Sequence, residues 1–236
     1  RVLLRLDLNV PLDNQGDITD DSRIRKSLPT INSILKKNPK KIIIISHLGR
    51  PKGKVILKFK LTKVARRLKN LLKQDVIKTK DCINIKLPLT KIVVLENLRF
   101  HKEEKNNNTS FAKKLSAYAD IYINDAFGTA HRKHASNNAI TKFLPSYAGL
   151  LIKKELEKLN LRKSKKPIVA ILGFAKLSDK IELLKVLLKK VDKVIFAGLV
   201  TFTFLKAQGH NVGKTPIDAK KIRTAKLMLK KYKNKI

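Results

Sequence analysis

Short apolar runs alternate along this chain with longer segments in which apolar residues recur at helical spacing. The clearest run is Ile42 to Ile45, four consecutive isoleucines, which is typical of a strand buried on both faces of a parallel sheet. Strands alternating with helices predict an α/β fold in which helices cover a parallel sheet. We expect strands at 1–7, 82–85, 91–95, 120–125, 168–172 and 194–197, and helices at 20–37, 61–73, 109–118, 146–163, 181–191, 201–207 and 218–232.

Polar residues at the predicted helix starts indicate N-caps. Asp21 or Ser22 is expected to cap the helix at 20–37, Thr109 the helix at 109–118, and Ser178 the helix at 181–191. The polar segment 102–108 is predicted to be a loop. The pattern also predicts two domains, at 1–148 and 166–236, joined by a helix and linker at 149–165.

Composition narrows the class of protein. The longest apolar run is far below the 18 residues of a membrane span, and no signal peptide is visible, so we expect no membrane association. The single cysteine, Cys82, excludes an internal disulfide and favours the cytoplasm.

The formal net charge of +36 raises the possibility of a basic nucleic-acid-binding protein. Only 11 of the 54 basic residues are arginine, however, and the lysines are spread along the whole chain. Tryptophan is absent, and the aromatic residues are not interleaved with lysines as in a stacking surface. We therefore expect no specific nucleic-acid partner.

Basic residues follow three of the predicted strands, where ligands bind in open α/β sheets. His47 and Arg50 follow the four isoleucines, Arg99 follows 91–95, and Arg132 follows 120–125. Since the carboxyl ends of parallel strands share one edge, the arginines should converge. Their mutual repulsion then favours a multiply charged anion, bound through charge-assisted hydrogen bonds.

Three polar residues near the first strand have two interpretations each. Asp7 and Asn9 could bind a hydroxy-acid ligand from one face of an extended segment, or could simply form a turn before Pro11. Arg23, in the first turn of a helix, could bind a ligand anion or be a solvated surface arginine.

The second predicted domain carries Lys176 and Lys180 at a strand-to-helix turn, where backbone N–H groups and lysines could hold phosphate. The G-x-x-x-x-G-K-[ST] spacing of a Walker A loop is absent. His131 and His134 lack a carboxylate or cysteine to complete a metal site, so we expect no metal ligands in the chain.

Five motifs, in this order and spacing, resemble the phosphoglycerate kinase family over the whole chain. They are Asp7-Leu-Asn9-Val-Pro11, Asp21-Ser-Arg23-Ile-Arg25, Ser46-His47-Leu-Gly-Arg50-Pro51, Leu95-Glu-Asn-Leu-Arg99-Phe100-His101 and Asn124-Asp-Ala-Phe-Gly-Thr-Ala-His-Arg132.

The resemblance implies a Rossmann-like, two-domain hinged enzyme of glycolysis, expected to be a monomer. This kinase transfers the acyl phosphate of 1,3-bisphosphoglycerate to MgADP, giving 3-phosphoglycerate and ATP. It further implies glycerate binding by 1–148 and nucleotide binding by 166–236. By motif, the substrate residues are Asp7, Asn9, Arg23, His47, Arg50, Arg99 and Arg132; the nucleotide residues are Gly173, Lys176, Lys180 and Gly198; Arg23 and Lys176 are the catalytic pair.

Two places depart from the family pattern. The family's glycine pair before the first lysine is here Gly173-Phe174, and its glycine-rich run after the next strand is here Ala197-Gly198-Leu199-Val200-Thr201, which adds bulk near the nucleotide. The family's magnesium-ligand carboxylate is expected to lie outside this chain, whose second domain reads as truncated. The sequence therefore predicts a fragment of a kinase of this family. The alternatives are an inactive phosphoglycerate-binding remnant and a basic nucleic-acid-binding protein.

Overall fold

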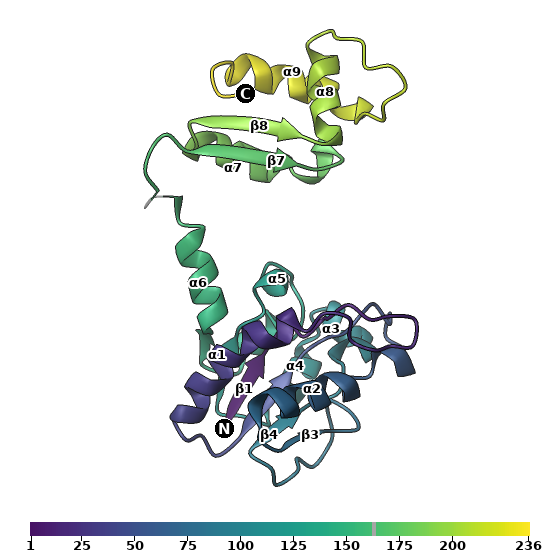
Figure 1. Ribbon diagram of the computed structural model, residues 1–236, viewed down its shortest axis with the longest axis vertical. Coiled ribbons are helices and arrows are strands. Elements are labelled where there is room, and N and C mark those ends of the chain that lie inside the picture. The colour runs from purple at the N-terminus through teal and green to yellow at the C-terminus, as the bar shows by residue number, and fades with distance from the viewer. Residues whose placement is uncertain (162–163) are drawn as a thin grey trace. The chain divides into compact units, whose positions relative to one another are not determined.

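The chain forms two compact units, Arg1–Glu157 and Lys158–Ile236, in a computed structural model that describes residues 1–161 and 164–236 (Figure 1). The division lies inside the predicted linker at 149–165, of which residues 162 and 163 fall outside the described residues. Each unit is described by itself.

A six-stranded sheet forms the centre of the first unit, with strand order β3-β4-β2-β1-β5-β6. Every neighbouring pair is parallel; Val2 pairs with Ile42 on one side and Ile121 on the other. The strands are β1 Val2–Arg5, β2 Ile42–Ile45, β3 Val76–Lys78, β4 Ile92–Val94, β5 Ile121–Asn124 and β6 Ser146–Ala148.

Helices cover both faces of this sheet, as the apolar runs predict (Figure 1). Alternate residues of the buried strands enter different cores because side-chain direction has a period of two. Ile42 and Ile44 pack with α1 and α2, whereas Ile43 and Ile45 pack with α4 and the 3-10 turn Ala139–Lys142. The helices are α1 Ser22–Lys36, α2 Thr62–Leu72, α3 Lys102–Lys105, α4 Thr109–Ser116, α5 Phe127–Ala130 and α6 Leu150–Lys158.

Three predicted elements of the first unit are wrong. The strand expected at 82–85 is irregular chain, and the real edge strand is Val76–Lys78, which the sequence pattern missed. The expected loop at 102–108 contains α3. The expected helix at 146–163 begins instead with β6, which pairs with β5 through backbone hydrogen bonds, and α6 starts only at Leu150.

The caps also differ from the predictions. Asn108, rather than Thr109, caps α4 by accepting a hydrogen bond from Phe111 N. Asp21 occupies the N-cap of α1 but makes no side-chain cap hydrogen bond, because its carboxylate pairs with Arg25 and Arg67. Ser178 caps nothing: it lies in a 3-10 turn, and α7 begins later.

The start of α6 depends on a residue distant in sequence. Asp125 Oδ1, just beyond β5, accepts hydrogen bonds from Leu151 N at 2.8 Å and Ile152 N at 3.2 Å. Its other oxygen accepts from Thr30 Oγ1 at 2.5 Å. Asp125 thus joins the sheet, α1 and α6 at one buried point.

The second unit is built on two parallel strands, β7 Val169–Gly173 and β8 Lys193–Ala197. One face of this pair packs with α7, α8 and α9 in a third core. Val169, Ile171 and Ile195 on the other face are about half exposed or more. The helices are α7 Ile181–Lys190, α8 Leu199–Ala207 and α9 Ile222–Lys231.

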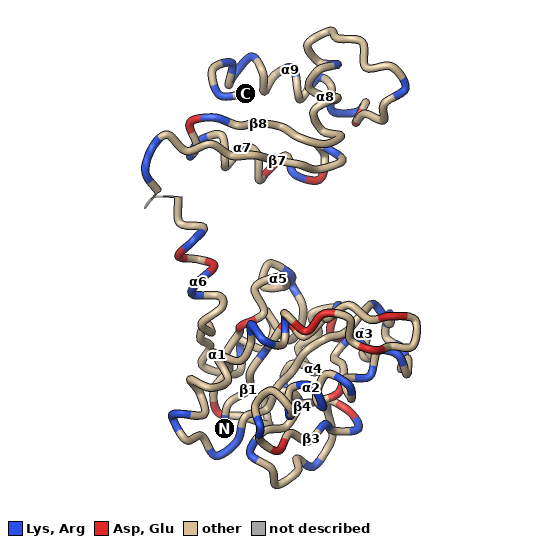
Figure 2. The backbone as a smooth tube through the Cα atoms, in the orientation of Figure 1, with Lys and Arg blue, Asp and Glu red and all other residues tan. Residues whose placement is uncertain are grey.

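Lysines and arginines occur along nearly the whole of the described backbone in both units, as their spread along the sequence predicts (Figure 2). Among the described residues, no helix has both the length and the apolar character needed to cross a membrane.

The two-faced burial of the sheet predicts unequal costs for truncating two isoleucines. Ile44→Ala removes a fully buried side chain and should lower the free energy of unfolding of the first unit by about 2–5 kcal/mol. Ile77, 42% exposed in the edge strand β3, is the matched control, and Ile77→Ala should cost about 1 kcal/mol or less. Urea unfolding measures both; equal costs would contradict the assigned burial.

Candidate functional site

Three loops at the carboxyl edge of the first sheet enclose a cationic pocket of about 300 Å³. It is lined by Arg50 after β2, Arg99 after β4 and Arg132 after β5, with Lys52 and Lys105; these five residues are called the arginine pocket below. The sequence predicted this convergence, and no carboxylate lines the pocket. The arrangement suits a ligand with several negatively charged oxygens.

Arg99 is the most enclosed of the three arginines, at 7% exposure. Its Nη1 donates to Gly49 O at 2.9 Å, while its buried Nε has no hydrogen-bond partner. Burial, followed by repulsion from Arg132 and Arg5, lowers the pKa of the Arg99 guanidinium to about 10. An anion among these charges would relieve that repulsion.

The buried side chain of Asn97 fixes the loop that presents Arg99. Its Oδ1 accepts from Arg99 N at 3.0 Å and Leu48 N at 3.2 Å, and its Nδ2 donates to Leu48 O and Phe59 O. Sequence reasoning missed this role, although Asn97 lies in a motif it identified. A neutral amide that holds two loops together adds no charge to a crowded cationic site.

His47, predicted as a ligand residue, lies beneath the pocket with only 2% exposure. Its Nδ1 is 3.2 Å from Arg5 Nη2, and since a guanidinium can only donate, Nδ1 accepts. The neutral ring therefore carries its proton on Nε2. Burial first, and then the neighbouring arginines, depress the pKa of His47 far below its ordinary value.

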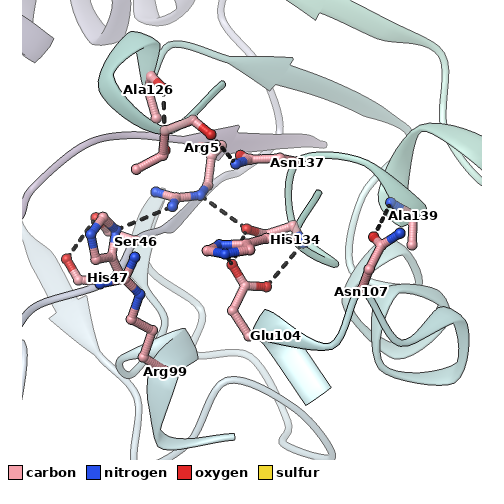
Figure 3. A network of polar contacts seen from close by, with 12 residues as sticks. Arg5, Ser46, His47, Arg99, Glu104, Asn107, Ala126, His134, Asn137 and Ala139 are labelled. Atoms are coloured by element: carbon pink, nitrogen blue, oxygen red, sulfur yellow. Dashed lines mark hydrogen bonds and ion pairs between the residues drawn. The ribbon is translucent and has the colours of Figure 1, made fainter. Parts of the chain in front are cut away.

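Arg5 is fully buried and connects His47 to a second buried group (Figure 3). Arg5 Nε donates to Ser136 Oγ at 3.0 Å, and Ser136 Oγ donates to Glu104 Oε1 at 2.6 Å. His134 Nδ1 lies 3.7 Å from the same carboxylate oxygen. The residue pattern gave no sign of Arg5 or Glu104 as site residues, because a strand arginine and a polar-loop glutamate are ordinarily exposed.

Two of the other predicted substrate residues lie at a second cavity of about 390 Å³. Asp7 and Arg23 both line it, and they form an ion pair with each other. Arg23 therefore has a protein carboxylate as partner, which the sequence did not anticipate. Asn9 does not line this cavity; its Oδ1 accepts from Gly49 N at 2.7 Å, which ties the segment after β1 to the loop that carries Arg50.

Gly128 allows α5 to approach Asp7 closely. A Cβ atom at this position would lie 2.9 Å from Asp7 Oδ2. A side chain here would therefore displace the carboxylate that holds Arg23. Gly128 lies within the Asn124 to Arg132 motif, and this was the signal in the sequence that could have identified it as a site residue.

The predicted nucleotide residues occupy the carboxyl end of the β7–β8 pair in the second unit. Gly173 ends β7, and Gly198, with φ +69°, precedes α8. Lys176 and Lys180 are exposed on either side of the 3-10 turn Leu177–Asp179. Lys176 thus precedes this turn, and Lys180 is the N-cap residue of α7.

Within the described residues, one trio has metal-ligand types close together: Asp81, Cys82 and His101 in the first unit. His101 Nε2 is 2.7 Å from Asp81 Oδ1 and Cys82 is fully buried. A thiol and an imidazole do not suit Mg²⁺, which prefers oxygen ligands. This trio, which lies in the first unit, therefore does not suit magnesium.

The family model described as "Phosphoglycerate kinase" matches residues 1–236. The chain is 50% identical over 245 residues to a phosphoglycerate kinase of Nostoc sp. strain PCC 7120. The aligned region covers all of this chain and 61% of that protein. A Chlorobium chlorochromatii relative of the same name is 48% identical, with 62% of its length covered.

Solved structures agree with these relatives. Phosphoglycerate kinase from Coxiella burnetii superposes with a TM-score of 0.84 at 39% identity, over 99% of this chain and 60% of that one. Phosphoglycerate kinase from Pyrococcus horikoshii superposes with a TM-score of 0.80 at 29% identity, over 98% of this chain and 62% of that one. The chain thus spans about three fifths of the length of these proteins.

The buried neutral His47 predicts a loss of stability in mild acid. Its folded-state pKa is depressed, so the unfolded chain alone takes up a proton as the pH falls below about 6.5. Replacement by asparagine keeps an acceptor for Arg5 and removes this proton. His47→Asn should make the decline between pH 6.5 and 5 shallower by up to about 1.4 kcal/mol per pH unit.

Urea unfolding at fixed ionic strength and several pH values measures this slope. An unaltered slope in His47→Asn would mean that His47 takes up its proton over the same pH range in the folded and the unfolded chain, and would contradict a neutral buried ring.

Proposed function

The chain belongs to the phosphoglycerate kinase family, and we propose that its first unit binds the glycerate substrate of that family's reaction. The observation that carries the proposal is the arginine pocket, in which Arg50, Arg99 and Arg132 meet with no carboxylate in the lining. A phosphate or carboxylate group matches such donors in charge and in planar geometry. 3-Phosphoglycerate and 1,3-bisphosphoglycerate carry these groups.

The proposed reaction transfers the acyl phosphate of 1,3-bisphosphoglycerate to ADP. The bond between phosphorus and the carboxyl oxygen breaks, a bond to an ADP phosphate oxygen forms, and 3-phosphoglycerate leaves with a free carboxylate. Such a transfer needs positioning and charge neutralisation and no covalent intermediate on the protein. The arginine pocket would position the end of the substrate that does not react.

Arg23 and Asp7 are proposed to act at the reacting end. The Arg23 side chain is 48% exposed and ion-paired with Asp7. We assign Arg23 to stabilise the charge that develops on the transferred phosphoryl group. For this role, the Arg23 guanidinium would leave the Asp7 carboxylate and pair with the phosphoryl oxygens. Asp7 and Asn9 would then hold the hydroxyl and carboxylate region of the substrate.

Gly173, Lys176, Lys180 and Gly198 are proposed to bind ADP or ATP in the second unit, with Lys176 also contacting the transferred group. Two exposed lysines after β7, with Gly198 directly after the neighbouring parallel strand β8, support this assignment. Magnesium would enter with the nucleotide phosphates, since no described carboxylate set fits the ion. The proposal includes a monomer in the cytoplasm, where the free thiol of Cys82 would remain reduced.

Calorimetric titration with 3-phosphoglycerate tests the proposed function. Each charge-assisted contact contributes about 1.5–3 kcal/mol, so Arg50→Ala with Arg132→Ala should weaken binding by at least about 100-fold. The matched control, Arg66→Ala with Arg223→Ala, removes two exposed arginines elsewhere and should change Kd only about twofold. Equal losses in both pairs would mean that general charge attracts the ligand, and no binding to the folded parent would refute the proposal.

A further inference from the structure

Glu104 is a buried carboxylate next to a strongly cationic site. It lies in α3 and has 0% exposure. Burying an ionised carboxylate is costly unless hydrogen bonds and opposite charges compensate for lost water. The compensation here comes from groups that support the arginine pocket.

Two hydrogen bonds join the Glu104 carboxylate to Ser136. Oε1 accepts from Ser136 Oγ at 2.6 Å, and Oε2 accepts from Ser136 N at 3.0 Å. The Glu104 backbone carbonyl also accepts from Ala135 N at 2.8 Å. Three bonds therefore fix the chain a few residues after Arg132, and they limit where the Arg132 guanidinium can lie.

The same serine connects Glu104 to Arg5. Ser136 Oγ accepts from Arg5 Nε while it donates to Glu104, so one hydroxyl bridges the buried guanidinium and the buried carboxylate. Arg5 Nη2 in turn donates to His47 Nδ1. A chain of contacts thus runs from Glu104 through Ser136 and Arg5 to the His47 ring; Figure 3 labels Glu104, Arg5 and His47.

We propose that Glu104 is a positioning residue for anion binding: through Ser136 it fixes the loop that bears Arg132 and, through Arg5, the ring of His47. This inference rests on the proposed function for the identity of the ligand. Glu104 lines neither the arginine pocket nor the Asp7 cavity, so it acts through other residues rather than on the substrate.

Electrostatics and positioning predict opposite results for Glu104→Gln. Removing a negative charge close to a cationic pocket raises the local positive potential and should tighten anion binding. Positioning predicts the reverse, because the glutamine NH₂ cannot accept the Ser136 hydroxyl proton. The contact can then persist only with the amide donating, and the Ser136 hydroxyl, which already accepts from Arg5 Nε, loses the acceptor for its own proton. The sign of the change in Kd therefore separates the two effects.

The experiment compares Glu104→Gln with Glu103→Gln, a neighbouring exposed glutamate on the same helix, in the full chain. Calorimetry gives the Kd for 3-phosphoglycerate under conditions where thermal melts show each variant to be folded. We expect the Kd to rise on the order of tenfold for Glu104→Gln, because small misplacements of binding groups weaken binding. Glu103→Gln should leave it unchanged or slightly lower.

Imidazole nitrogen NMR supplies a readout that loop stability alone would not move and that needs no ligand. In the parent, His47 should give the signature of a neutral ring protonated on Nε2. Glu104→Gln should shift the His47 Nδ1 resonance, and Glu103→Gln should not. If Glu104→Gln does not fold, Ser136→Ala, which removes the same bridge and keeps the charge, is judged by the same two measurements.

An unchanged or lower Kd in Glu104→Gln overturns the inference, and so does a raised Kd with an unmoved His47 resonance. Failure of the unmodified chain to bind 3-phosphoglycerate would instead refute the proposed function. The His47 resonances would then still decide whether Glu104 positions this network.

Discussion

Parallel pairing of the strands in the first unit brings the ends of β2, β4 and β5 to one edge of the sheet. Each of these strands is only three or four residues long. All described residues of β2 and β4 are buried and β5 is partly buried, so the register is determined by side chains that enter two different cores. The loops that carry Arg50, Arg99 and Arg132 therefore start from rigid points. The geometry of the cationic site follows from this pairing.

Bringing arginines together creates repulsion that the protein must accommodate. Arg99 is nearly buried, and Arg5 beneath it is fully buried. Glu104 opposes the effect of these charges on Arg99, and it reaches Arg5 through the Ser136 hydroxyl rather than directly. The pocket lining is thus cationic and can bind an anion, whereas the buried side chains of Arg5 and Glu104 carry opposite charges.

Neutral groups do much of the remaining positioning. Asn97 holds the Arg99 loop, Asn9 holds Gly49, and Gly128 leaves space for the Asp7 carboxylate. In the second unit, Lys176 and Lys180 have no comparable support from buried partners, and Phe174 packs edge-on against Phe196 near the strand ends. The first unit is therefore the better defined of the two candidate binding regions.

The sequence by itself determined the α/β class, the main buried strands and the convergence of three arginines, because these follow from local apolar runs and from the direction of parallel strands. Tertiary structure decided the rest. The edge strand Val76–Lys78 is recognisable only by its pairing with β4, and the helix cap at Asp125 bonds residues 26 and 27 positions away. Glu104 appears in a polar segment typical of a loop, yet its contacts with Ser136, 32 residues later, bury it completely. Burial of a charge depends on partners distant in sequence, and local pattern carries no information about them.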